Sequence, residues 1–111
     1  MATWADGGAV REDDLEGLPP DSAGRGYTTR YRWGVTGRGR PRVVVQIIRG
    51  RSVVGEGRAV VHPRLNGVGM TRVLIDPDFP TDPFHRAVYA TVNRVLRVRY
   101  PDVSWFYIPW V

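Results

Sequence analysis

Four side chains suited to binding a divalent cation crowd into the stretch "DPDFPTDPFH", residues 76–85. Asp76, Asp78, Asp82 and His85 supply three carboxylates and one imidazole, and oxygen ligands of this kind hold metal ions that assist hydrolysis. The same spacing has a simpler reason, because Asp-Pro pairs are common turn and helix-cap signals in which Asp bonds the local backbone. We therefore predict that this stretch is structural, with no metal site and no cofactor.

Residues for nucleophilic catalysis are scarce. The chain has no cysteine, which excludes thiolate catalysis, a disulfide framework and a thiolate metal site. His62 and His85 have no recognisable serine motif beside them. His62 directly precedes Pro63, which indicates that it is the last residue of a strand. The sequence therefore favours binding over catalysis.

Positive charge is concentrated in the middle of the chain. Residues 1–24 contain six acids and one arginine, residues 25–64 contain ten arginines and the single acid Glu56, and residues 65–111 contain five arginines and four acids. A GC-rich coding sequence would explain why arginine replaces lysine throughout, but it would not explain the clustering. A basic body of this kind attracts polyanions or acidic protein surfaces. The candidate binding residues are Arg30, Arg32, Arg38, Arg40, Arg42, Arg49, Arg51 and Arg58.

The chain divides into an arm and a domain. Residues 1–24 are rich in Gly, Asp and Pro without a sustained period, which predicts a flexible acidic arm with Trp4 as its only candidate anchor. Residues 25–111 are expected to form a single basic α+β domain. No stretch reaches the ~18 apolar residues of a membrane span, and no signal-peptide pattern is present. We expect a soluble, cytoplasmic protein that binds no membrane.

Four strands are expected to precede a helix. In residues 27–33 aromatic residues and threonine alternate with arginine, a period typical of a half-buried strand. Further strands are predicted over 42–48, 51–62 and 71–75, separated by the glycine-rich loop "GVTGRGRP", a turn at Arg49-Gly50 and the stretch "HPRLNGVG". The aromatics of the first strand either stack on bases or fill the core, and core packing is favoured because a meander must bury one face.

The helix is predicted to begin with Asp82 as N-cap and Pro83 at its first position, and to end at Tyr100-Pro101. Its apolar stripe comprises Phe84, Val88, Val92, Val95 and Leu96. The final segment, "VSWFYIPW", is apolar at successive positions and predicts an interior strand or one that a partner covers. The expected fold is a four-stranded antiparallel meander, then one helix and a last strand (β-β-β-β-α-β), with the helix packed on one face of the sheet.

The hairpin "VVVQIIRGRSVVGEGRAVV", followed by "TRVLIDPDF", a helix and "DVSWFYI", resembles the central part of the GNAT acyltransferase fold over residues 42–108. The resemblance implies an acyl-CoA site at the helix start, where a basic, glycine-rich loop holds the pyrophosphate. This chain has "FPTDPFHRA" there, with no glycine and with Asp82 where a phosphate would lie, and a carboxylate repels such a ligand. The resemblance therefore implies a reduced scaffold without activity.

Three functions remain open. The first is a non-enzymatic module whose arginine-rich hairpin face binds a polyanion, with nucleic acid favoured over other polyanions. The second is a protein-interaction module, such as a small inhibitor or adaptor, that docks on an acidic or hydrophobic surface or forms a homodimer through its C-terminal strand. Aromatic anchors for such an interface are Trp105, Tyr107 and Trp110. The third is the reduced acyltransferase scaffold.

Overall fold

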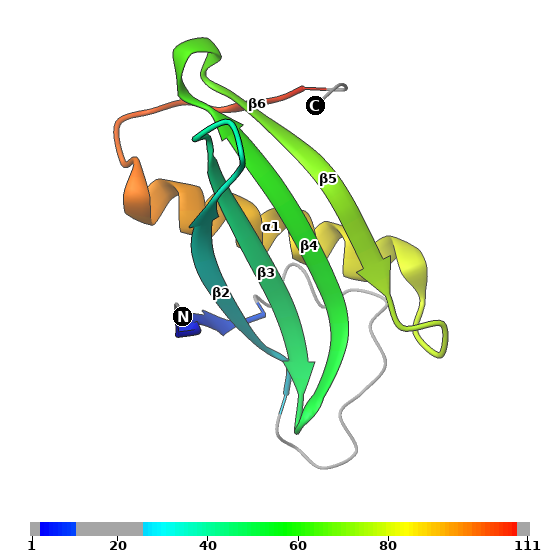
Figure 1. Ribbon diagram of the computed structural model, residues 1–111. Coiled ribbons are helices and arrows are strands. Elements are labelled where there is room, and N and C mark those ends of the chain that lie inside the picture. Colours follow the sequence, from blue (N-terminus) through cyan, green and yellow to red (C-terminus); the bar gives the residue numbers. More distant parts are fainter. Residues whose placement is uncertain (1–2, 11–25, 109–111) are drawn as a thin grey trace.

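The computed structural model describes residues 3–10 and 26–108, and in them one sheet packs against one long helix (Figure 1). The strands lie in the sheet in the order in which they occur in the chain. All neighbours are antiparallel except the last pair, which is parallel. The elements are β1 (Ala5–Ala9), β2 (Thr28–Val35), β3 (Pro41–Arg49), β4 (Ser52–His62), a 3-10 turn (Pro63–Leu65), β5 (Gly67–Ile75), α1 (Thr81–Arg99) and β6 (Phe106–Tyr107).

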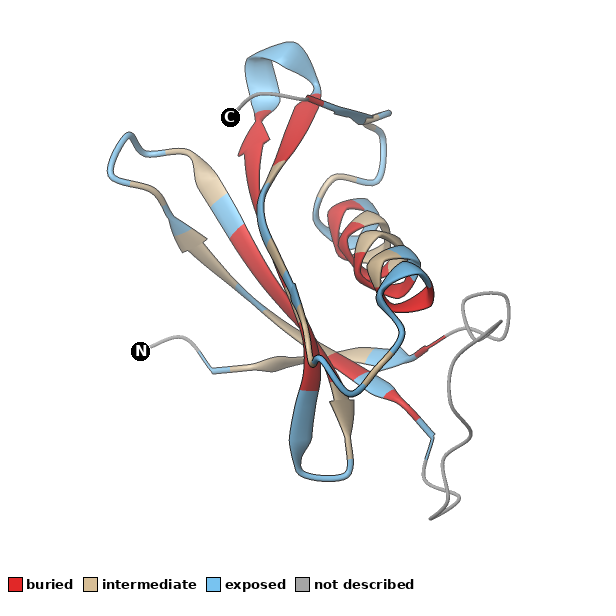
Figure 2. Cartoon of the chain, turned by 90° about the vertical axis from the view of Figure 1, so that its right-hand side faces the viewer, coloured by how far each residue is buried: buried red, intermediate tan, exposed pale blue. Residues whose placement is uncertain are grey.

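The helix covers one face of the sheet, and within residues 3–10 and 26–108 no other helix or sheet lies over the opposite face (Figures 1 and 2). Alternate residues of β3, Val43, Val45 and Ile47, are fully buried against the helix side. The predicted apolar stripe of α1 is confirmed, since all five of its residues are buried. Tyr27 lies in this core, and Tyr31 and Trp33 of β2 are partly buried and pack against it, in agreement with the favoured alternative for these aromatics.

Glycine in β4 allows the helix to approach the sheet closely. A Cβ placed on Gly57 would overlap Cγ1 of Val88 and lie 3.2 Å from the terminal methyl group of Met70. The absence of a side chain at Gly57 therefore lets Val88 of the helix lie directly against the strand. The neighbouring Val54 is an extra residue in the β3–β4 ladder, because Ile47 pairs with Gly55 while Ile48 pairs with Val53.

The helix begins two residues earlier than predicted, at Thr81. Its N-cap is Pro80, in an extended conformation and with no side-chain cap hydrogen bond, so the prediction of an Asp82 N-cap is wrong. Asp82 lies inside the first turn instead, where its charge still suits the positive end of the helix dipole. The predicted end is confirmed: the Tyr100 amide donates to the Leu96 carbonyl at 2.7 Å, and Pro101 follows.

Two features of the sheet differ from the prediction. Residues 5–9 form the additional edge strand β1, and the amide of the next residue, Val10, donates to the Tyr27 carbonyl at 2.9 Å. At the opposite edge β6 has only two residues and is parallel to β5, so it is an edge strand and not the interior strand that was one of the two predicted alternatives. The rest of the predicted acidic arm, 11–24, lies outside the described residues. No helix in the described part of the chain combines the length and apolar character that a bilayer crossing requires.

Candidate functional site

The face of the sheet opposite α1 carries the largest group of predicted site residues, and we call it the open face. Residues directly opposite each other in a ladder point to the same side of the sheet, which fixes its membership from strand register. Among the described residues, five arginines and two carboxylates point to the open face: Arg30, Arg32, Arg42, Arg58 and Arg72, with Asp6 and Glu56.

A row of arginines crosses the middle of the open face. Arg32 of β2 lies opposite Val44 of β3, Val44 lies opposite Arg58 of β4, and Arg58 lies opposite Arg72 of β5. Val44, which lies between Arg32 and Arg58 in this row and points away from the helix, is only 8% exposed; long arginine side chains can cover neighbouring apolar surface with their methylene groups. Arg58 and Arg72 are like charges placed directly opposite each other, an arrangement that destabilises a sheet unless something neutralises it.

A polar network in the next row fixes two of these arginines. Nε of Arg30 donates to Oε1 of Gln46 at 2.8 Å, and Nε2 of Gln46 donates to Oε1 of Glu56 at 2.7 Å. The second carboxylate oxygen of Glu56 lies 3.5 Å from Nε of Arg58. The network crosses three strands and occupies both oxygens of the carboxylate with groups of the sheet itself. Asp6 is also engaged, since its Oδ1 accepts from the Gly8 amide at 2.8 Å.

An aromatic ring at the edge of the open face orders the arginines of β2. The guanidinium carbons of Arg30 and Arg32 each lie 4.6 Å from the centre of the Trp4 ring, within cation–π range. Trp4 is half-buried in this position and precedes β1. It is therefore an anchor, as the sequence suggested, and it anchors a strand that the sequence did not predict.

A basic pocket adjoins one end of the open face, between the β2–β3 loop and the 3-10 turn. It encloses about 460 Å³ and is lined by Arg38, Gly39, Arg40, His62, Pro63, Arg64 and Leu65. No carboxylate is among these lining residues. His62 is 5% exposed, and its burial together with the charge of Arg40 lowers the pKa of its imidazole below 6.5. We refer to this cavity as the basic pocket.

The remaining predicted arginines lie at the opposite end of the sheet. Arg49 and Arg51 flank the β3–β4 turn, and β3, which separates them from Arg40, has nine residues. At about 3.4 Å per residue that strand is roughly 30 Å long, so the two arginine groups cannot contact one small ligand together. Arg49 also turns toward the helix side, 5.9 Å from the Tyr27 ring centre and 5.8 Å from that of Phe79.

The eight predicted arginines are thus divided among three places: Arg30, Arg32, Arg42 and Arg58 on the open face, Arg38 and Arg40 at the basic pocket, and Arg49 and Arg51 at the far turn. Two arginines of these surfaces were missed, Arg72 on the open face and Arg64 in the pocket. Extending the strand alternation of β5 would have found Arg72. No sequence pattern indicated a role for Arg64, because the 3-10 turn that contains it lies beside the β2–β3 loop only in the folded chain.

The predicted aromatic anchors have structural contacts of their own. Trp105 packs against the core, with its ring centre 5.2 Å from that of Tyr100. Tyr107 is 37% exposed, lies 4.9 Å from the Tyr89 ring centre and donates from its hydroxyl to Oδ1 of Asn93 at 2.9 Å. Burial, and secondarily the proximity of Tyr89, raise the pKa of Tyr107 to about 12. Trp110 lies outside the described residues.

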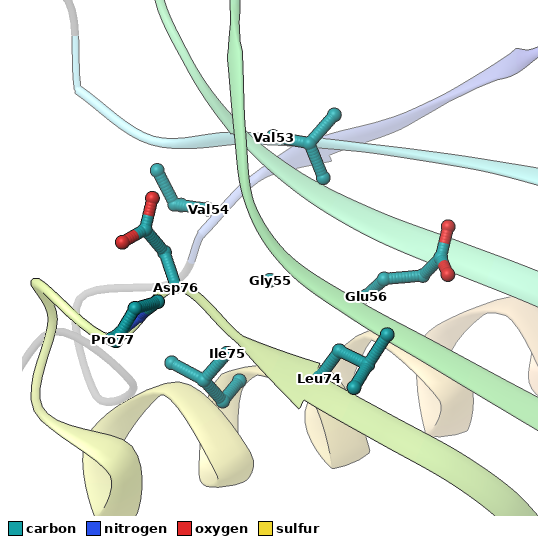
Figure 3. A pocket seen from close by; sticks show the side chains of 8 residues that line it. All are labelled: Val53, Val54, Gly55, Glu56, Leu74, Ile75, Asp76 and Pro77. Atoms are coloured by element: carbon teal, nitrogen blue, oxygen red, sulfur yellow. The ribbon is translucent and has the colours of Figure 1, made fainter.

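A second hollow, of about 320 Å³, lies between the start of β4 and the end of β5 (Figure 3). Exposed Val53 and Leu74 give it an apolar lining, while Glu56 and Asp76 lie on opposite sides of it (Figure 3). Oδ1 of Asp76 accepts from the Asp78 amide at 2.9 Å, the local turn bonding expected for this residue. In the described ranges no three His, Cys, Asp or Glu side chains are grouped to hold a metal ion.

Comparison of the chain with models of protein families, with curated proteins and with solved structures finds no match. The two basic surfaces, the open face and the basic pocket, are the features of the described residues that bear on function.

Proposed function

We propose that the chain is a nucleic-acid-binding module that uses the open face to contact the phosphate backbone. The observation that carries this proposal is the row in which Arg32, Arg58 and Arg72 share one side of the sheet, with Arg58 and Arg72 directly opposite each other. Like charges in adjacent positions lower stability, and the single carboxylate of Glu56, 3.5 Å from Arg58, offsets only part of the charge of the three arginines in the row. A bound polyanion recovers that loss and releases counterions as it binds.

The geometry suits an extended polyanion better than a small one. The row from Arg32 to Arg72 spans four strands, roughly 14 Å at about 4.8 Å per strand. Arg42 and Arg30 extend the charge to either side of the row along the strand direction. Guanidinium groups match phosphate oxygens in a bidentate arrangement, whereas the open face offers few polar groups to read base edges. Affinity is therefore expected to depend strongly on salt and weakly on sequence.

The test compares two variants with equal loss of charge. Arg32→Gln with Arg72→Gln removes the two ends of the row, and Arg51→Gln with Arg97→Gln removes two exposed arginines elsewhere. Fluorescence anisotropy with single-stranded and duplex oligonucleotides is measured over a series of salt concentrations. The first variant is expected to bind more weakly, with a shallower dependence of log affinity on log salt, by about 0.7 to 0.9 for each lost phosphate contact. An equal loss in both variants would reject the open face as the site.

A protein partner is the second candidate function, and the exposed C-terminal edge favours it. Phe106 of the edge strand β6 is 53% exposed, and Val98 on α1 is 75% exposed. An edge strand with apolar side chains is a template for pairing with another chain, including a second copy of this one. Sedimentation of the native protein and of Phe106→Asp over a range of concentrations tests this. A dimer that the substitution dissociates supports it, and a monomer at every concentration rejects homodimerisation.

The reduced acyltransferase scaffold makes a different prediction. Asp82 lies in the first turn of α1, where a pyrophosphate would need to approach the helix amides. Acetyl-CoA is therefore expected to leave the melting temperature unchanged. A stabilisation that Asp82→Asn increases would show that the helix start binds the cofactor.

A further inference from the structure

The basic pocket differs from the open face in shape and in its residues. Three arginines surround a buried imidazole, and none of the residues that line the cavity is acidic. Its volume of about 460 Å³ falls within the range of small-molecule sites, roughly 300 to 1,000 Å³. It has room for a phosphate group together with part of the molecule that carries it.

The loop that supplies two of the arginines is ordered by hydrogen bonds that all involve Thr36. Oγ1 of Thr36 accepts from the amides of Arg38 at 3.3 Å and Arg40 at 3.1 Å, its carbonyl accepts from the Gly39 amide at 2.9 Å, and its own amide donates to the Arg40 carbonyl at 2.9 Å. Gly39 has φ +79°, which a residue with a side chain rarely adopts. These bonds order the backbone of the loop and so fix the positions from which the side chains of Arg38 and Arg40 extend.

The opposite wall of the pocket is formed by the 3-10 turn Pro63–Leu65, whose backbone conformation is also fixed by a hydrogen bond. Arg64 lies in the 3-10 turn that follows His62 directly, and Asn66 closes this turn in the left-handed conformation with φ 50°. Its amide donates to the Pro63 carbonyl at 3.3 Å. Arg38 and Arg64 are exposed on either side of the cavity, while Arg40 and His62 lie deeper. The cavity thus offers cationic groups at its mouth and at its base.

The charge in the pocket favours a dianion. A phosphate monoester carries a charge of about −1.5 to −2 near neutral pH, whereas a diester within a nucleic-acid chain carries one charge. Three guanidinium groups without a lining carboxylate match the monoester better. The effect of Arg40 on the pKa of His62 shows that the field of these arginines reaches the imidazole, so an anion that neutralises Arg40 will be detected at His62.

We infer that the pocket formed by Arg38, Arg40, His62 and Arg64 is a binding site for a phosphate monoester. The group has two sources, the terminal phosphate of a nucleic acid or a free nucleotide. The first source rests on the proposed function, because β4 carries the alternation of Arg58, Val60 and His62 from the open face to the pocket, and a strand lying on the open face would end there. The second source does not depend on it.

The primary experiment follows the imidazole by NMR. The two histidines are titrated without ligand and with inorganic phosphate, a nucleoside 5′-monophosphate or the corresponding nucleoside. The phosphate-bearing probes are expected to raise the pKa of His62, and the nucleoside is not. His85 lies in the first turn of α1, away from the pocket, and serves as an internal control. An unchanged His62 titration at saturating phosphate concentrations would overturn the site.

A variant experiment assigns the effect to the pocket. Arg38→Gln with Arg64→Gln changes two exposed residues and is expected to abolish the response of His62 to the nucleotide. Arg32→Gln with Arg72→Gln on the open face is expected to preserve it. The opposite pattern, with the response lost in the open-face variant and kept in the pocket variant, would place the phosphate elsewhere and reject the inference.

The two sources are separated with oligonucleotides that differ only at one end. If the terminal phosphate of a nucleic acid is the ligand, a 5′- or 3′-phosphorylated strand binds at least several-fold more tightly than its hydroxyl counterpart, and the pocket variant removes the difference. If the phosphorylated and the hydroxyl-ended strands bind equally while the nucleotide still raises the pKa of His62, the free nucleotide is the ligand. If the native protein binds neither oligonucleotide while the nucleotide still raises the pKa of His62, the proposed function is rejected and the phosphate site in the pocket is supported.

Discussion

Gln46 of β3 donates a 2.7 Å hydrogen bond from Nε2 to Oε1 of Glu56 on β4, and this contact engages the central carboxylate of the open face within the sheet. The amide oxygen of Gln46 is at the same time the acceptor for Arg30. One buried amide thus connects a carboxylate to an arginine that it does not touch directly. The acid serves to position basic side chains while reducing the net positive charge of the face.

Replacement of Glu56 by Gln is expected to strengthen nucleic-acid binding. The substitution removes a negative charge beside Arg58 and keeps a side chain that can accept from Gln46. Its effect on stability should be small, within about 1 kcal/mol, because the Arg58–Glu56 ion pair is partly solvated. Anisotropy at low salt measures the affinity, with Asp102→Asn as a control of equal charge change in an exposed position away from the sheet. Weaker binding by Glu56→Gln alone would mean that the carboxylate contributes to the site.

Reversal of the charge of Arg72 is expected to separate stability from binding. Arg72→Glu places a carboxylate opposite Arg58, so a like-charge pair becomes an opposite-charge pair. Cross-strand pairs of this kind contribute about 0.2 to 1 kcal/mol. Urea denaturation should therefore show equal or greater stability while oligonucleotide affinity falls. A variant that is clearly less stable than the native protein would show that Arg72 has a structural role instead.

Acid should destabilise the fold through His62. Burial and Arg40 hold the pKa of the folded imidazole below 6.5, so the unfolded chain binds the proton more readily. The stabilising contribution is present above pH 6.5 and is lost as the pH falls from that value through the lowered pKa of the folded state. Denaturant unfolding at a series of pH values should show that the free energy of unfolding falls as the pH is lowered, and His62→Gln should weaken this pH dependence. An equal pH dependence in the native protein and the variant would show that His62 is not its source.

The close packing of sheet and helix can be tested at Gly57. Gly57→Ala adds a methyl group that overlaps Cγ1 of Val88, and overpacking of this kind costs about 1 to 3 kcal/mol. Val88→Ala alone leaves a cavity and is also destabilising. The double variant should lose less stability than the sum of the two single variants, by roughly 0.5 to 3 kcal/mol. Strict additivity in urea denaturation would mean that the two residues do not interact.

The fold was largely predictable where local pattern decides it. Alternation in β2 and the apolar stripe of α1 are properties of neighbouring residues, and both were predicted correctly. β1 was missed because its sequence, ADGGA, has two glycines and no apolar alternation, and it is held by pairing with β2 and by Trp4 between two arginines. The interior-strand alternative for β6 was wrong, because apolar residues at successive positions predict burial within the chain, whereas Phe106 is an exposed edge residue.

The candidate site was predictable in composition and not in arrangement. The sequence shows that arginines cluster, yet an antiparallel meander sends Arg40 and Arg49 to opposite ends of one strand. The position of Arg72 opposite Arg58 depends on a register shift in the β4–β5 ladder, between Arg58 and Ala59. Side chains that meet across strands are fixed by register, which residue types alone do not determine.

The most direct test of the open face follows the arginine Nε–H resonances by NMR during titration with an oligonucleotide. The account predicts that Arg32, Arg42, Arg58 and Arg72 respond together and saturably, while Arg51 at the far turn and Arg97 on the helix do not. Responses confined to the far turn or to the helix, or no saturable response at low salt, would contradict the central claim that the bare face of the sheet binds nucleic acid.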